Sequence, residues 1–185
     1  MNLTGKRSPD AFWTHDVADA AALEAVAPSP NYTDWGSGAG IPGLLWAAIS
    51  GGTIRSVEAT SRKCAFQREF ARTLSLEQSQ YAIVNARIEE DTPTKVIPVT
   101  ARAVASLKTL LTWADAVGSS LPFAIFFKGE NAEEEIEEAG TDFQFDHIIH
   151  PHPFRERSHL VRITNLERRS GDGGTDSRET RVSVR

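Results

Sequence analysis

The feature that most constrains this chain is a glycine-rich stretch at residues 34–43, between a short extended run and an apolar helical segment. Its fixed points are Asp34, Gly36, Gly38 and Gly40, which give the pattern acidic-x-G-x-G-x-G. Glycine lets the backbone turn tightly and approach a ligand without an intervening side chain. The following helix points unpaired N–H groups and its positive dipole end into the same space. The sequence therefore predicts a cradle for the polar end of a nucleotide-like cofactor.

Two cofactors compete for this cradle. Residues 38–43 also fit G-x-G-x-x-G, the dinucleotide fingerprint, but that pattern is weak alone and here begins well past the strand end. A nicotinamide dehydrogenase is the less favoured alternative, because it gives Asp34 and Gly36 no role. S-adenosylmethionine has no pyrophosphate but has an amino group that Asp34 can attract, directly or through water. We therefore predict S-adenosylmethionine as the cofactor.

A second candidate cofactor contact follows the next predicted strand. Glu58 stands about 20 residues after the glycines, where a ribose-binding acid is expected. A carboxylate there accepts hydrogen bonds from both ribose hydroxyls, and each such charged bond contributes roughly 1.5–3 kcal/mol. Alone, Glu58 would be interpreted as a solvated charge at a strand end. After this loop, the ligand role is favoured.

Composition is that of an ordinary globular protein of one domain. The 185 residues carry a net charge of −5, which argues against a wholly basic nucleic-acid binder. Much of the acid lies in residues 133–138, which we interpret as a solvated helix face. The single cysteine, Cys64, excludes an internal disulfide framework and fits a reducing cytoplasm as a small buried residue. No stretch has the pattern of a membrane span or a secretory signal, and we expect a monomer.

Predicted strands and helices alternate along the chain. Strands are predicted at residues 31–33, 53–57, 81–85, 96–100, 123–127, 143–150 and 160–166. Helices are predicted at residues 11–26, 44–49, 61–74, 103–116 and 132–139, the first of them capped by Ser8. This alternation predicts an α/β fold with a mostly parallel seven-stranded sheet and helices on both faces.

We assign residues 1–168 to one domain. Within it, residues 8–27 form a helical entry segment and residues 31–167 form the sheet core, whereas the polar residues 169–185 are expected to be a disordered tail. In such folds ligands bind at the carboxyl ends of the strands, beside the topological switch point. The candidate contacts that fall just after a predicted strand are the glycine loop, Glu58, Ile88, Glu89, Arg102 and Lys128. Their convergence on one edge is stronger than any single motif.

Several further motifs occur together in the order of a known family. They are Asn2-Leu3-Thr4, Trp13 with His15 and Asp19, the glycine loop, Val57-Glu58, Arg62-Lys63 with Phe66, Thr-Ala-Arg-Ala-Val-Ala at residues 100–105, and Lys128-Gly129. With them the chain resembles, from about residue 2 to 166, the bacterial small-subunit ribosomal RNA guanine-N7 methyltransferases, also called glucose-inhibited division protein B. The glycine loop alone indicates a methyltransferase; the His15 and Asp19 helix and the 100–105 block are the family-specific parts.

The resemblance implies a class I S-adenosylmethionine-dependent methyltransferase fold, which is Rossmann-like, and methylation of a guanine N7 in 16S ribosomal RNA within the small subunit. It implies that Glu58 binds the ribose and that Ile88 and Glu89 lie beside the adenine. It implies that Arg102 closes the pocket. In the loop, Gly36 and Ile41 are implied to contact the cofactor, with Gly38 and Gly40 shaping the loop. The implied candidates for the mouth where the guanine enters are His15, Asp19 and Lys128.

No catalytic residue and no metal site are expected. Guanine N7 has a lone pair and no proton, so it can attack the methyl group without a general base. Because the product guanine is cationic, we expect Arg102 to face the cofactor carboxylate or an RNA phosphate instead of the reacting ring edge. The histidines at 147, 150 and 152 are expected to be surface residues and not metal ligands.

The sequence departs from the family pattern at three places. The family usually has a few tens of largely helical residues before the Asn-Leu-Thr motif, Ala20 stands where serine is common, and Trp35 stands where a smaller aliphatic residue is usual. Two alternatives therefore stay open. The protein uses the same cofactor on a different acceptor, or it is a truncated module that binds without turnover.

Overall fold

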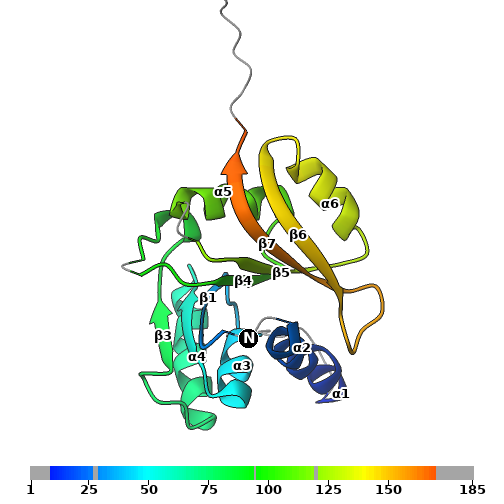
Figure 1. The fold of residues 1–185 in the computed structure, drawn as a ribbon. Helices are drawn as coiled ribbons and strands as arrows, with labels where there is room; N and C mark the ends of the chain where they lie inside the picture. The colour runs from blue at the N-terminus through cyan, green and yellow to red at the C-terminus, as the bar shows by residue number, and fades with distance from the viewer. Residues whose placement is uncertain (1–8, 27–28, 94, 119–120, 170–185) are drawn as a thin grey trace, which may run out of the picture.

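The centre of the molecule is a seven-stranded sheet, seen in a computed structural model that describes residues 9–26, 29–93, 95–118 and 121–169 (Figure 1). The strands are β1 (Asn31–Trp35), β2 (Thr53–Val57), β3 (Tyr81–Val84), β4 (Val99–Arg102), β5 (Ala124–Lys128), β6 (Phe143–Pro151) and β7 (His159–Arg168). Their order is β3-β2-β1-β4-β5-β7-β6. β1 to β5 are parallel, and β7 is antiparallel to β5 and β6. The predicted mostly parallel sheet of seven strands is confirmed.

Helices cover both faces of this sheet, as predicted. They are α1 (Pro9–Ala11), the π-helical η1 (Phe12–Val17), α2 (Ala18–Val26), α3 (Gly43–Ser50), α4 (Ser61–Thr73), the 3-10 turn η2 (Ile88–Glu90), α5 (Leu107–Val117) and α6 (Ala132–Ala139). α2, α3 and α4 pack on one face, and α5 and α6 pack on the other (Figure 1). The predicted entry helix is therefore present but contains a π-helical stretch in its first half.

The two cores meet at β1, because alternate side chains of a strand point to opposite faces. Tyr32 packs on the α2–α4 side, where its ring lies perpendicular to that of Trp46 with centroids 5.1 Å apart. Trp35 packs on the α5 side, nearly perpendicular to Trp113 at 6.4 Å. The large residue at position 35 is thus accommodated by an aromatic partner on α5.

Two predicted boundaries differ from the structure. β4 begins at Val99 and not at residue 96, because Pro98 has no N–H to donate to the ladder; its carbonyl accepts a hydrogen bond from Thr33 N–H at 2.8 Å. α5 begins at Leu107 and not at residue 103. Ala103 has a left-handed φ of 54°, and the Ser106 hydroxyl caps the helix.

Some predictions fall outside the described residues. These are the Asn-Leu-Thr motif, the Ser8 cap and residues 170–185 of the expected tail. Arg169, the first residue of that tail, is attached to the domain, since its N–H donates to Asp142 O at 2.9 Å.

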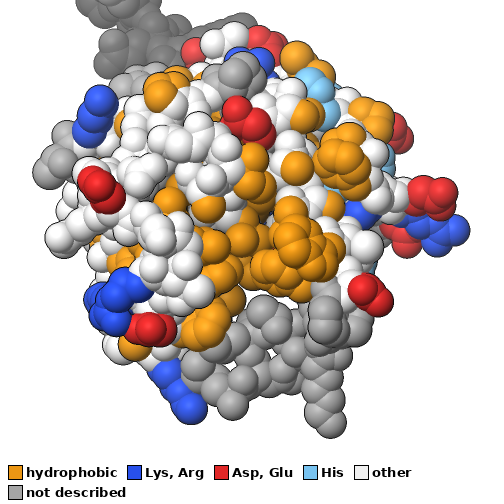
Figure 2. All heavy atoms as spheres, turned by 90° about the horizontal axis from the view of Figure 1, so that it is seen from below, with side chains coloured by type: hydrophobic (Ala, Val, Ile, Leu, Met, Phe, Trp, Pro, Cys, Tyr) orange, Lys and Arg blue, Asp and Glu red, His pale blue; other side chains and the backbone are white. Residues whose placement is uncertain are grey.

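Large hydrophobic side chains are exposed at a few described positions: Trp13 (64%), Ile49 (52%), Ile148 (53%) and Phe154 (62%). Figure 2 views the molecule from the side of α1 to α4 and shows hydrophobic side chains gathered across this face. Within the described ranges, no helix has the length and apolarity needed to cross a bilayer.

Candidate functional site

The glycine loop and the end of β4 lie at the carboxyl edge of the sheet. β1 pairs with β2 on one side and with β4 on the other, so the order of the strands reverses there. Gly36 follows β1, Glu58 follows β2, and Arg102 ends β4. A reversal of this kind leaves a crevice at the strand ends, where open α/β sheets bind their ligands. The structure therefore brings the residues of the predicted cofactor site to one place.

The alternating glycines are explained by backbone conformation. Gly36, Gly38 and Gly40 all have left-handed φ angles, of 61°, 59° and 86°. An added Cβ at Gly36 would lie 2.7 Å from Val104, and one at Gly40 would lie 2.3 Å from Leu44. At Gly38, an added Cβ would have one described neighbour within 4 Å, the Gly36 carbonyl oxygen at 3.8 Å. The loop is thus packed at both ends and faces open space at Gly38.

A buried glutamine that the sequence analysis missed supports this loop from beneath. The side-chain amide of Gln67 donates to Ser37 Oγ and to the Gly38 carbonyl, each at 2.8 Å. Its oxygen accepts hydrogen bonds from Ser56 at 2.7 Å and Tyr81 at 2.6 Å. Its spacing in the sequence could have indicated that Gln67 is buried, since it shares the inner face of α4 with the buried residues at 64 and 71.

Glu58, which follows β2, reaches the glycine loop with its side chain, as its position in the sequence suggested. The side chain is buried. Its Oε2 accepts from Gly38 N–H at 2.9 Å, and its Oε1 accepts from Thr60 N–H at 2.8 Å. An ionised carboxylate has about four lone-pair sites, so capacity remains for further donors such as ribose hydroxyls.

Asp34 lies directly below the loop and is 1% exposed. Its Oδ2 accepts from Gly43 N–H at 3.2 Å, whereas its Oδ1 is buried and has no hydrogen-bond partner among the described residues. Burial raises the pKa of Asp34 to about 7, against the lowering effects of the Gly43 N–H and of Arg102. The ionised form of such a buried carboxyl group is stabilised when a positive group lies nearby. Because Asp34 is buried below the loop, we expect a positive group of the ligand to contact it through water.

The other predicted cofactor contacts differ in their exposure. The Ile41 side chain is buried in the core between the sheet and α2–α4, so only its backbone faces the loop. Ile88 and Glu89 lie in η2, which begins after a three-residue connection from β3. Ile88 is half-buried against the core that contains Trp35, and Glu89 is exposed.

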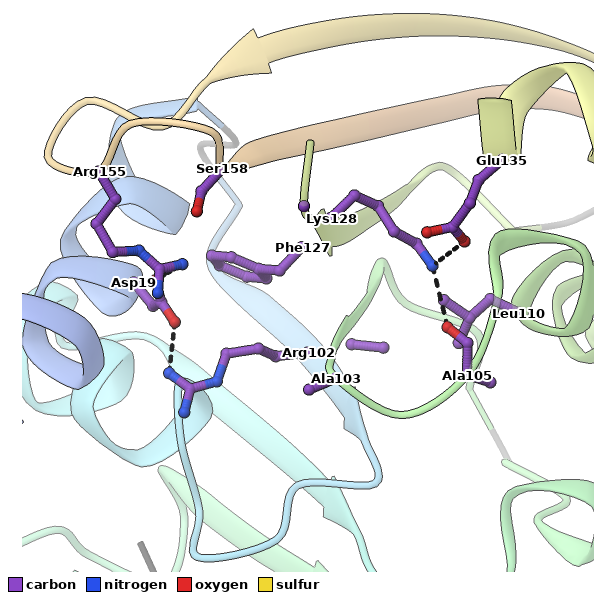
Figure 3. Close-up of a pocket in the computed structure, with 12 residues that line it drawn as sticks. Asp19, Arg102, Ala103, Ala105, Leu110, Phe127, Lys128, Glu135, Arg155 and Ser158 are labelled. Carbon is purple, nitrogen blue, oxygen red and sulfur yellow. Dashed lines mark hydrogen bonds and ion pairs between the residues drawn. The ribbon is translucent and has the colours of Figure 1, made fainter. Parts of the chain in front are cut away.

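A cavity of about 390 Å³ lies beside the glycine loop (Figure 3). Its walls come from the ends of β4 and β5, from α2, α5 and α6, and from the loop between β6 and β7. The segment after β4 separates this cavity from the loop, since Ala103 and Ala105 line the cavity and Val104 packs against Gly36. Of the three predicted mouth residues, Asp19 and Lys128 line the cavity.

Asp19 is fully buried and joins three basic side chains. It pairs with Arg102, with Arg155 at 2.7 Å and with His152 at 2.9 Å. Asp16 accepts a further hydrogen bond from Arg102 at 2.8 Å. Burial lowers the pKa of Arg102, but the charges of Asp19 and Asp16 outweigh this effect and raise it. This cluster holds α2, β4 and the β6–β7 loop together.

The structure shows which groups hold Arg102. Its guanidinium pairs with Asp16 and Asp19, and the residue also lines the cavity, so its expected contact with the cofactor carboxylate or an RNA phosphate stays a prediction. His15 and Asp19, four residues apart on the entry helix, are linked through a third residue. His15 is exposed, and Arg155 bridges the two, with its Nη1 at 3.5 Å from His15 Nδ1.

Lys128 lies on the opposite side of the cavity from Asp19 (Figure 3). Its Nζ donates to Ala105 O at 3.0 Å and to Glu135 at 2.7 Å, and its side chain is almost entirely buried. Glu135 also accepts from Leu107 N–H at 2.6 Å. The interpretation of residues 133–138 as a solvated face is therefore wrong for Glu135, which is partly buried and fixes the start of α5.

The prediction that the three histidines lie on the surface is wrong for His152. Its Nδ1 accepts from Phe154 N–H at 3.2 Å, so Nε2 carries the proton donated to Asp19. Burial, followed by the charge of Arg155, lowers the pKa of His152 and favours this neutral form. In the part of the chain that the structure describes, no three His, Cys, Asp or Glu side chains are grouped to hold a metal ion.

Removal of the Asp19 charge tests the cluster. Asp19→Asn leaves two guanidinium groups and His152 without their shared carboxylate, and breaking a buried pair costs about 3–5 kcal/mol. We expect a fall of this size in the free energy of unfolding, measured by urea denaturation. The control is Asp115→Asn, which removes a more exposed pair with Arg168 and should have a much smaller effect. Equal effects in the two variants would contradict the assignment.

The raised pKa of Asp34 predicts a pH dependence of stability. The unfolded chain releases this proton near pH 3.8, whereas the folded chain holds it until about pH 7. The folded state therefore loses stability as pH rises between these values, by roughly 4 kcal/mol at about 1.4 kcal/mol per pKa unit. Denaturation curves of Asp34→Asn across this range should lack that loss. Parallel pH profiles for the variant and the parent would exclude the effect.

Comparison with known proteins identifies the family. The family model described as GidB, rRNA small subunit methyltransferase G, matches residues 1–160. The ribosomal RNA small subunit methyltransferase G of Gluconobacter oxydans is 31% identical over 169 residues, which cover 91% of this chain and 86% of that protein. A protein of the same name from Methylorubrum extorquens is 37% identical over 174 residues, 90% of this chain and 81% of that protein.

Solved structures share the fold at low sequence identity. The ribosomal protein L11 methylase of Lactobacillus delbrueckii superposes with a TM-score of 0.62 at 18% identity, covering 82% of this chain and 78% of that chain. The magnesium protoporphyrin IX methyltransferase of Synechocystis, solved with bound SAM, gives 0.55 at 13% identity, with 87% and 80% covered. The sheet is thus that of the class I methyltransferases. By its family match and its relatives, the chain belongs to the rRNA small subunit methyltransferase G family.

Proposed function

We propose that this protein methylates N7 of a guanine in 16S ribosomal RNA of the small subunit, with S-adenosylmethionine as the methyl donor. The observation that carries the proposal is the placement of an open glycine cradle next to a cavity of about 390 Å³ at one edge of the sheet. The names of the relatives support the RNA acceptor. An acceptor inside the ribosomal subunit supports a cytoplasmic location.

The residues of the cradle fit this cofactor. Open space at Gly38 admits a ligand against the backbone, and the buried Glu58 carboxylate has capacity for the two ribose hydroxyls. The unpaired Oδ1 of Asp34 offers negative charge to an ammonium group through water. Bound S-adenosylmethionine supplies a methyl group on a positively charged sulfur.

The chain's own contribution is positional. Guanine N7 has a lone pair and no proton, so no side chain has to remove one. Holding the acceptor and the methyl group in line can lower the barrier by about 7–11 kcal/mol. Walls that exclude water and fix the approach are therefore sufficient for catalysis.

The charges around the cavity also suit a product that gains positive charge. The cationic side chains at or beside the cavity are each paired with an acid, in a set formed by Arg102, Arg155 and Lys128 with Asp16, Asp19 and Glu135. Their formal charges cancel. The cationic ring of the methylated guanine would therefore meet no excess of positive charge.

A branched side chain in the cradle should abolish cofactor binding. Gly38→Val places methyl groups in the open space above the loop, with a backbone strain of about 1–2 kcal/mol from the left-handed φ. Gly51→Val is the matched control, because Gly51 has a φ of 72° and similarly open surroundings at the end of α3. We expect calorimetry to detect binding of S-adenosylmethionine to the control and none to Gly38→Val. Unchanged affinity in Gly38→Val would refute the role of the loop.

Methyl transfer tests the function directly. The protein is incubated with labelled S-adenosylmethionine and small ribosomal subunits that lack the modification, with Gly38→Val as the inactive control. We expect label on one guanine, released with the chemistry of N7-methylguanine when the RNA is treated with mild base. Label on another atom, or cofactor binding without transfer to RNA, would show that the acceptor is different.

A further inference from the structure

The loop between β6 and β7 contributes to the cavity wall and also carries an exposed aromatic ring. Arg155 and Ser158 of this loop line the cavity (Figure 3). Phe154, which immediately precedes Arg155, is 62% exposed. Exposed phenyl surface is unfavourable in water, and this ring lies on a loop that also contributes residues to the cavity wall, so we take it as a candidate ligand contact.

Phe154 is held between two anchors that share one partner. His152 and Arg155 both bind the buried carboxylate of Asp19, at 2.9 and 2.7 Å. The backbone N–H of Phe154 donates to the ring Nδ1 of His152. The backbone N–H of His152 donates to Ser158 O at 2.8 Å, and this hydrogen bond closes the loop. The backbone of the ring is therefore fixed before any ligand arrives, which reduces the entropic cost of binding.

The ring has room for a planar partner. Its nearest described aromatic neighbour is His152, whose ring lies at 72° to it with centroids 6.1 Å apart. This arrangement is an edge contact and not a stack. The exposed part of the Phe154 ring is thus available for stacking with a flat group.

Hydrogen-bond donors and positive charge lie next to the ring. Arg155 anchors the loop, because its guanidinium pairs with the buried Asp19 and its Nε is itself buried. Arg157 is largely exposed, and its contact with Glu130 is a loose 3.5 Å. The charge of Arg155 is balanced by Asp19, so Arg157 is the arginine of this loop that faces solvent, with its side chain 81% exposed. An aromatic ring with adjacent arginines is the combination that binds single-stranded nucleic acid, by stacking on bases and contacting phosphates.

We propose that the β6–β7 loop binds an unpaired stretch of RNA next to the methylated guanine, with Phe154 stacked on a neighbouring base and the exposed Arg157 contacting its backbone. The inference rests on the proposed function for the RNA acceptor. It adds the conformation of the substrate, because a base can stack on this ring only when it has left its own helix.

The test compares variants that leave the anchors intact. Phe154→Ala and Phe154→Leu remove the aromatic face, and Phe154→Trp keeps one. Ile148→Ala is the control, since Ile148 is 53% exposed but lies within β6, outside the β6–β7 loop. The measurements are the Kd for a fluorescent, unstructured RNA oligonucleotide, the KM and kcat on small subunits, and the affinity for S-adenosylmethionine.

We expect Phe154→Ala and Phe154→Leu to raise the Kd for the oligonucleotide and the KM for subunits roughly tenfold. Cofactor affinity should not change, Phe154→Trp should stay within about twofold of the parent, and Ile148→Ala should match it. The inference is overturned if Phe154→Ala behaves like Ile148→Ala. It is also overturned if only the KM on subunits changes, since the ring would then contact a ribosomal protein.

The same measurements separate this inference from the proposed function. Oligonucleotide binding that depends on Phe154, in a parent protein that transfers no methyl group to guanine N7, would uphold the loop and reject the function. Methyl transfer to N7 that is indifferent to the Phe154 substitutions would uphold the function and reject the loop.

Discussion

The side of this molecule that we propose to receive the acceptor depends on one buried carboxylate. Asp19 is fully buried, and a charge removed from water is tolerated only with partners that replace its hydration. Its partners come from the end of β4 and from the β6–β7 loop, 83 residues or more further along the chain. Displacing any one of these elements would leave a buried charge without its partner. The cavity wall therefore depends on the entry helix, β4 and the β6–β7 loop together.

The cofactor side was largely predictable from the sequence because its signals are local. The acidic residue, the alternating glycines and Glu58 lie within 25 residues, on adjacent parallel strands. Left-handed φ angles favour glycine, and a βαβ unit fixes which strand end Glu58 reaches. The strand and helix order followed from the alternation of elements for the same reason. Boundaries failed where one residue overrode the pattern, as Pro98 and Ala103 did.

The acceptor side was not predictable to the same degree, because its pairings are long-range. Sequence spacing placed His15 and Asp19 near each other on the entry helix, but gave no indication that Arg155 would lie between them. Arg102 was correctly placed at the end of β4, yet its orientation depends on Asp16 and Asp19, which the sheet topology alone does not locate. The resemblance identified positions on this side, whereas only the structure shows their partners.

The separation of the two sides has a mechanistic consequence. The glycine loop is fixed by Gln67 and Glu58, and the acceptor wall is fixed by Asp19, through hydrogen-bond networks with no shared residue among the contacts described. The segment after β4 joins them, with Val104 against the loop and Arg102 in the Asp19 cluster. The entry helix also packs on α3, the helix that follows the loop, where Trp46 Nε1 donates to Glu24 at 2.8 Å. The residues at 100–105 are therefore one of two described connections between the proposed acceptor side and the proposed cofactor side.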